Sequence, residues 1–158
     1  MPSPTAAQGD ELRRLMQRLF RRFGALAADA TPCGKPLSMA HAHALMVLLA
    51  NGELSQQELG VELCIDKSNV ARLSARMVEA GHIDQRPSKK DGRSRLLSLT
   101  AKGTRLAREV DAASGARFGS LLRVLPPTSR RRVLESLHEL VTSLDKLPVV
   151  GPMERRSR

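Results

Sequence analysis

The stretch 66–80, DKSNVARLSARMVEA, has the pattern of a short helix with two different faces. Asp66 is a good N-cap residue, because its carboxylate can accept a hydrogen bond from the free N–H groups of the first turn. One face carries apolar side chains at helical spacing, namely Val70, Leu73, Met77 and Val78. The opposite face is polar and carries Ser68, Asn69, Arg72, Arg76 and Glu79. Taken alone, the pattern favours a half-buried helix with a solvated face, and only the flanking sequence favours a helix that contacts DNA.

A second short helix precedes this stretch. Residues 54–59, LSQQEL, form a capping box in which Ser55 caps the helix and the Glu58 side chain reaches back to the cap. This helix is expected to end near Cys64, so a tight turn joins it to the next one. Two short helices joined in this way, the second with a polar outer face, form a helix-turn-helix.

The sequence after Gly81 predicts a β-hairpin. Residues 82–86 and 95–100 have the composition of strands, and the turn pair Asp91-Gly92 lies between them. The expected hairpin tip is basic, with Lys89, Lys90, Arg93 and Arg95. A hairpin beside a helix-turn-helix is a wing, so the predicted fold is mainly α with a small β-hairpin wing.

Longer helices flank this winged segment. A helix from Asp10 to about Ala28 places apolar residues on one arc and arginines on the other, which are Arg14, Arg18, Arg21 and Arg22. Ser38 is expected to cap a helix over 39–50, with Met39, Ala42, Met46 and Leu49 facing inward. Thr100 is expected to cap a helix over 101–125. A last helix over 127–147 has the near-heptad apolar spacing of a helix-pairing seam. Residues 1–9 and 149–158 are expected to be disordered tails.

Composition limits the function classes. The 158 residues include 26 Lys and Arg against 16 Asp and Glu, a formal net charge of +10, which favours a polyanionic partner such as nucleic acid. There is no Trp or Tyr, so the core must consist of aliphatic side chains, which suits packed helices. The sequence shows neither a membrane span nor a signal peptide, and two cysteines make no disulfide framework. A cytoplasmic protein without a membrane partner is expected.

The order of these elements resembles the MarR family of bacterial transcription regulators, over about residues 10–147. The most specific match is DGRSRLLSLTAKG at 91–103, similar to the family's wing signature of Asp-x-Arg, a short strand, and Leu-Thr-x-x-Gly at the start of a helix. The stretch 66–81 is similar to its recognition helix. Residues 37–49 resemble its second helix, although His41 stands where Gln is common.

The resemblance implies a homodimer with a winged helix-turn-helix lobe and a helical dimerisation layer. Residues 10–30 and 101–148 would form the layer, and residues 37–100 the DNA-binding lobe. Two lobes would then face half-sites of a near-palindromic operator about 34–36 Å apart. The expected function is a transcriptional regulator, a repressor released by a small-molecule effector. The alternatives are a regulator without an effector and a dimeric protein-interaction module that does not bind DNA.

Roles follow from the geometry of such a complex. Ser68, Asn69, Arg72 and Arg76 would project into the major groove, with Arg72 as the candidate for a bidentate contact to guanine. Arg93 would enter the minor groove, and the resemblance implies that Asp91 pairs with it. Lys89, Lys90 and Arg95 would contact phosphates. Ser38 and Ser55 lie at helix N-termini, where backbone N–H groups can also bind a phosphate.

The sequence gives weaker support for other kinds of functional site. The family often binds small anionic aromatic ligands in a cleft, for which Arg18, His41, His43 and Met46 are candidates, although ordinary packing explains them equally well. Cys33, near Lys35, is a candidate redox site, and Cys64 is expected to be a small core residue. Cys33 and His41 would be the best zinc ligands, but no metal-binding spacing occurs, so neither metal nor cofactor is expected. No catalytic constellation is present, so an enzyme is not expected.

Overall fold

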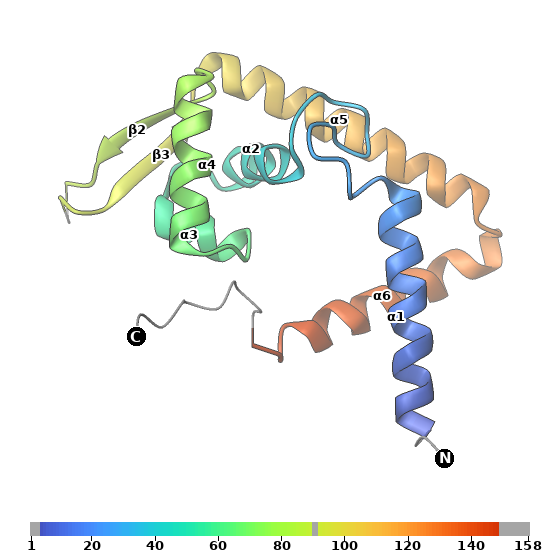
Figure 1. Ribbon diagram of the computed structural model, residues 1–158. Helices are drawn as coiled ribbons and strands as arrows, with labels where there is room; N and C mark the ends of the chain where they lie inside the picture. Colours follow the sequence, from blue (N-terminus) through green and yellow to red (C-terminus); the bar gives the residue numbers. More distant parts are fainter. Residues whose placement is uncertain (1–3, 90–91, 149–158) are drawn as a thin grey trace.

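The structure, a computed structural model, describes residues 4–89 and 92–148. A winged helix-turn-helix lobe lies at one end of the long helix α5, and α1 and α6 lie toward its other end (Figure 1). The predicted fold class, mainly α with a β-hairpin wing, is confirmed. The elements in chain order are α1 (Pro4–Phe23), α2 (Met39–Asn51), β1 (Leu54–Ser55), α3 (Gln56–Glu62), α4 (Lys67–Glu79), β2 (Ile83–Pro87), β3 (Arg95–Leu99), α5 (Ala101–Val124) and α6 (Pro127–Leu144).

Side-chain caps begin four of the helices where the sequence predicted them. Ser38 Oγ accepts a hydrogen bond from the His41 backbone N–H at 3.2 Å. Ser55 and Glu58 form the expected capping box. In the same way, the side chain of Asp66 caps α4 and that of Thr100 caps α5. Each such cap contributes about 0.5–2 kcal/mol and fixes where its helix starts.

The sheet has three antiparallel strands in the order β1-β3-β2. The two wing strands are confirmed, with Ile83 opposite Leu99 and Pro87 opposite Arg95. Strand β1, whose Leu54 pairs with Leu97, was not predicted. Two residues are too few to show strand periodicity, and Ser55 also caps α3, so its local signal is that of a helix start.

Helix α2 lies at the centre of the core, but its buried face differs from the prediction. Of the four inward positions expected, Ala42 is fully buried, and Met46 and Leu49 are partly buried and pack against the core. Leu45 and Leu48, which were not expected to face inward, are fully buried against Leu73, Met77 and other apolar residues of the lobe. Helix α2 is apolar on almost every side, so its sequence spacing does not single out one face.

Two further expectations about buried residues were wrong. Val78 is 39% exposed, and the inner face of α4 is completed by Ser74, whose hydroxyl donates to the Val70 carbonyl at 2.8 Å. Cys64 is exposed rather than buried. It occupies the turn between α3 and α4 with φ of 53°, a left-handed conformation that this tight turn requires and that directs its side chain outward.

Helix boundaries also differ at the ends of the chain. Helix α1 begins at Pro4, so residues 4–9 are helical rather than disordered, and Asp10 lies within the helix, where it pairs with Arg13 at 3.0 Å. It ends at Phe23 because Gly24 adopts a positive φ of 85°. Helix α6 ends at Leu144 rather than Leu147. The expected tails at 1–3 and 149–158 lie outside the described residues.

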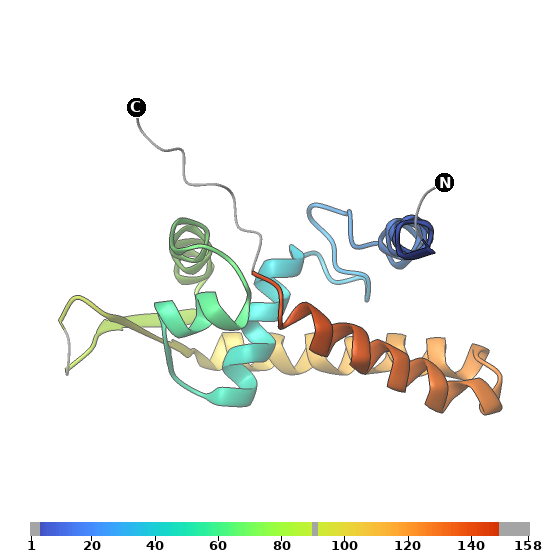
Figure 2. The same ribbon diagram turned by 90° about the horizontal axis from the view of Figure 1, so that it is seen from below.

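The helices away from the lobe leave their apolar stripes exposed. Helix α6 runs back from the end of α5 and diverges from it (Figure 1), and Figure 2 shows α1 end-on and apart from α6. Among the residues that the structure describes, α6 has no buried one. The exposed apolar side chains include Leu12, Leu15, Leu19, Phe20, Leu121, Leu134, Leu137, Val141 and Leu144. Exposed apolar stripes on several helices are typical of a surface that a partner covers.

None of the helices in the described ranges is both long enough and apolar enough to pass through a lipid bilayer.

Candidate nucleic-acid interface

A basic groove of about 750 Å³ lies between the wing and the helix-turn-helix. The first turn of α3, the turn at Cys64 and the start of α4 form one wall, and the wing forms the other. Lys67, Arg93 and Arg95 line it, and each is exposed. Three cations around one open groove suit a phosphate backbone. The sequence analysis did not select Lys67, although its position in the first turn of α4 was a usable signal.

The outward face of α4 presents the polar residues that the sequence placed there. Ser68, Arg72 and Arg76 are exposed and follow one another at intervals of four residues, so they share one face. Leu73 and Met77 anchor the opposite face in the core. The helix is therefore held rigidly by one side while the other stays available to a partner.

A chain of hydrogen bonds links three side chains at the start of α4. Asn69 Nδ2 donates to Asp66 Oδ2 at 2.6 Å, and the Asn69 backbone N–H donates to Asp66 Oδ1 at 2.7 Å. Arg72 Nη2 donates to Asn69 Oδ1 at 2.7 Å. Asn69 is only partly exposed as a result, unlike its neighbours on this face.

The wing is tied to the lobe by an ion pair from β2. The Arg86 guanidinium donates two hydrogen bonds to the Glu53 carboxylate, at 2.9 and 2.7 Å. Nearer the tip, Lys89 and Arg93 are exposed. Lys90 and Asp91, and with them the expected pairing of Asp91 with Arg93, lie outside the described residues.

The two serines proposed at helix N-termini have different surroundings. Ser55 directly precedes Gln56, which lines the basic groove, so its end of α3 lies beside the wing. Ser38 is half-buried, caps α2 and is not part of the groove wall. The structure therefore brings Ser55, but not Ser38, together with the wing cations.

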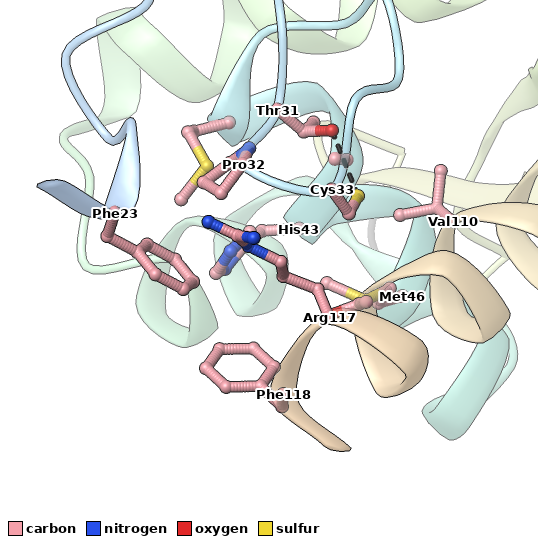
Figure 3. Close-up of a pocket in the computed structure, with 12 residues that line it drawn as sticks. Phe23, Thr31, Pro32, Cys33, His43, Met46, Val110, Arg117 and Phe118 are labelled. Carbon is pink, nitrogen blue, oxygen red and sulfur yellow. Dashed lines mark hydrogen bonds between the residues drawn. The ribbon is translucent and has the colours of Figure 1, made fainter. Parts of the chain in front are cut away.

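A separate cavity of about 210 Å³ lies where α1, α2 and α5 meet. Its wall is mainly apolar, with the rings of Phe23 and Phe118 tilted against each other at a centroid distance of 5.3 Å. Arg117 and His43 are the basic side chains among the residues that line this cavity (Figure 3). The full lining is Phe23, Thr31, Pro32, Cys33, Met39, Ala42, His43, Met46, Val110, Ser114, Arg117 and Phe118.

Two of the four expected effector residues, His43 and Met46, line this cavity, and Arg18 and His41 do not. The cation at the cavity is Arg117, which the sequence analysis missed. Its signal was weak: Arg117 follows Val110 at a spacing of seven residues on α5, so it shares the face that Val110 buries.

His41 is occupied elsewhere, because its Nε2 lies 3.0 Å from Nδ1 of His82 in a hydrogen bond. Burial is the main cause that lowers the pKa of His41 to about 4, and the charges of His82 and Arg76 lower it further. Burial, followed by the nearby Lys102, also lowers the pKa of His82. At neutral pH the two rings are thus uncharged, and the bond joins α2 to the junction between α4 and β2.

The structure gives little support to a redox site at Cys33 or to a metal site. Cys33 Sγ lies 3.0 Å from Thr31 Oγ1 in the cavity wall. The ammonium group of Lys35, the neighbour of Cys33 in the sequence analysis, pairs with Glu109 at 3.0 Å. Within residues 4–89 and 92–148, no group of three or more His, Cys, Asp and Glu side chains is arranged to hold a metal ion.

Comparison with known sequences points to one family. Residues 35–94 match the model of the MarR family. The exopolysaccharide II synthesis transcriptional activator ExpG of Rhizobium meliloti (strain 1021) is 37% identical over 103 residues, which are 61% of this chain and 50% of ExpG. The chain therefore spans half the length of that relative. The HTH-type transcriptional regulator PetP of Rhodobacter capsulatus is 26% identical, over 81% of this chain and 80% of PetP.

Solved structures share the fold. A MarR transcriptional regulator from Methanosarcina mazei superimposes with a TM-score of 0.72 at 23% identity, covering 87% of this chain and 98% of the other. Streptococcus pneumoniae FabT, solved in complex with DNA, has a TM-score of 0.70 at 17% identity, with coverages of 90% and 98%. Bordetella bronchiseptica BpsR, whose DNA binding is regulated by 6-hydroxynicotinic acid, has a TM-score of 0.68 at 20% identity, with coverages of 83% and 98%. The relatives named are regulators rather than enzymes, in agreement with the sequence analysis.

Proposed function

We propose that this chain, which belongs to the MarR family through residues 35–94, is a cytoplasmic regulator of transcription that binds duplex DNA sequence-specifically. One observation carries the proposal: the exposed cationic face of α4 lies beside a basic groove and a basic wing on one rigid lobe. A major groove about 12 Å wide accommodates one helix, and a wing beside it reaches the neighbouring minor groove.

Each side chain takes a role from its place on the lobe. Arg72, in the middle of the exposed face of α4, reads guanine, and Ser68 and Arg76 flank it. Arg93 enters the minor groove, where a narrow A·T-rich segment attracts guanidinium. Phosphates are bound by Lys67, Lys89 and Arg95 and by the N-terminus of α3 at Ser55.

A second copy of the chain covers the exposed apolar stripes. Residues 10–30 and 101–148 form the dimerisation layer, and residues 37–100 form the DNA-binding lobe. Support comes from the exposure of apolar residues on α1 and along all of α6, which a single chain leaves uncovered. A two-fold dimer then places its two α4 helices on half-sites of a near-palindromic operator.

The effector is a small aromatic carboxylate bound in the cavity at Arg117. The cavity volume of about 210 Å³ suits one ring, its wall offers Phe23 and Phe118 for stacking, and Arg117 with His43 can bind the carboxylate. The cavity lies between α2 of the lobe and helices α1 and α5, so a ligand there favours one lobe position over another. Release of a repressor stays a prediction, because ExpG is named an activator.

Replacing Arg93 with Ala should weaken operator binding by about 1–3 kcal/mol, because the minor-groove contact is lost. The measurement is a gel-shift titration on a duplex selected by the wild-type protein, with the solution mass determined in parallel. Arg14→Ala is the control, because Arg14 is also exposed but lies on α1 and does not line the groove. Unchanged affinity for Arg93→Ala would remove the wing from the mechanism, and a wild-type mass of one subunit would remove the dimer.

Small aromatic carboxylates should raise the melting temperature of the protein, and Arg117→Ala should abolish the shift. A ligand at 100 times its Kd stabilises the folded state by about 2.7 kcal/mol. The measurement is a thermal-shift screen of benzoates, with benzyl alcohol as the uncharged chemical control. Arg123→Ala is the matched variant on α5, because Arg123 is not part of the cavity wall. Equal shifts in both variants would place the ligand elsewhere, and no shift with any benzoate would favour the regulator without an effector.

A further inference from the structure

We propose that Asp66 and Asn69 do not read bases but act as positioning residues, which orient Arg72 toward a single guanine. The inference rests on the proposed function and adds to it which side chains at α4 contact bases and which orient another side chain. It also revises the expectation that Asn69 is itself a base-reading side chain.

The carboxylate of Asp66 determines which way the Asn69 amide points. One Asp66 oxygen accepts the backbone N–H of Asn69 at 2.7 Å, which is the helix cap. The other accepts Nδ2 of the same residue at 2.6 Å. A carboxylate only accepts hydrogen bonds, so the amide must turn its nitrogen toward Asp66 and its oxygen away.

The oxygen that is turned away meets Arg72. Asn69 Oδ1 accepts a hydrogen bond from Arg72 Nη2 at 2.7 Å, and a guanidinium can only donate. Each donor in the series from Arg72 through Asn69 to Asp66 therefore meets an acceptor. This bond uses one of the five N–H groups of Arg72, and the others remain for the O6 and N7 atoms of guanine. A side chain with many rotamers is thereby held in one orientation before DNA arrives, which lowers the entropic cost of binding.

The same bonds argue against direct reading by Asn69. A bidentate contact with adenine needs the amide oxygen and nitrogen to face one base together. Here the two atoms face two different side chains of the protein itself, Asp66 and Arg72. Reading adenine would therefore break the alignment of Arg72.

Asp66→Asn separates this role from the helix cap. Asparagine is as good an N-cap as aspartate, so α4 still begins at the same place. Its side-chain nitrogen, however, replaces the oxygen that accepts from Asn69, so the Asn69 amide must reverse and then present a donor to the donor on Arg72. Asp66→Ser is the matched control for the cap, because serine also caps the helix but has no second polar atom to reverse the amide.

The test is selection of sites from a randomised duplex library, followed by binding titrations on all four bases at each selected position. Wild-type protein should prefer guanine at one position in each half-site. Arg72→Ala should reduce that preference by roughly 5- to 150-fold. Asp66→Asn and Asn69→Ala should relax the same position and no other. The double variant Asp66→Asn/Arg72→Ala should discriminate no worse than Arg72→Ala alone, because the two changes remove one contact.

Two results would overturn the inference in different ways. If Asn69→Ala relaxes a different position, one with a preference for adenine, or if the losses in the double variant add, Asn69 reads DNA by itself and the positioning role is wrong while DNA binding stands. If the wild-type protein selects no sequence at all, the proposed function fails, and the positioning role fails with it. Unchanged melting temperatures in the four single variants would show that their effects do not come from unfolding.

Discussion

Raising the salt concentration from 50 to 200 mM is expected to weaken duplex binding by about 10³–10⁵-fold. Cations that bind phosphates release condensed counterions from DNA, and added salt opposes this release. The cations proposed to bind phosphates are Lys67, Lys89 and Arg95, all exposed, in each protomer. Two copies of these three residues reach the lower end of the range of about 6–10 phosphate contacts for which so steep a dependence is observed.

The measurement is an anisotropy titration on the selected duplex at several salt concentrations. The slope of log K against log salt is expected to be about −0.9 for each phosphate contact, and Lys89→Ala should make it less steep. Lys146→Ala is the control, because Lys146 follows α6, away from the groove. A flat salt profile would contradict phosphate binding and would favour the alternative of a dimeric protein-interaction module.

Replacing Gly103 with Ala is expected to destabilise the protein by about 3 kcal/mol, at the upper end of the usual cost of overpacking. A Cβ atom at Gly103 would overlap the backbone carbonyl of His82. That carbonyl cannot rotate away, because its oxygen accepts the Thr100 backbone N–H at 3.1 Å, and Thr100 Oγ1 donates to Gly81 at 2.7 Å. The close approach of α5 to the junction between α4 and β2 therefore requires glycine.

The measurement is thermal unfolding, in which such a loss lowers the melting temperature by roughly 6–12 °C for a chain of this size. Gly115→Ala is the matched control on the same helix, because a methyl group there meets nothing within 4 Å in the described chain. It should stabilise the protein by about 0.5–1 kcal/mol, since alanine favours helix. Equal melting temperatures for the two variants would mean that α5 does not approach His82 closely.

The features that the sequence predicted well are those that neighbouring residues determine. The caps at Ser38, Asp66 and Thr100 each need only a backbone N–H three residues further on. The wing strands and the polar face of α4 follow from alternation or helical spacing within one element. Short-range interactions of this kind are encoded within a few residues, so the order of elements and the presence of a winged helix-turn-helix could be predicted.

What the sequence missed depends on residues that are far apart in the chain. Only pairing with Leu97 makes Leu54 part of a strand, and only its neighbours in the core decide which face of α2 is buried. The same holds for the proposed effector site. His41 does not line the cavity and instead bonds to His82, whereas Arg117 lines the cavity because α5 packs along α2. The sequence alone thus determined the elements and the chemical character of their faces. The tertiary structure decided which side chains meet, because such contacts depend on how the elements pack and leave no periodic trace in the chain.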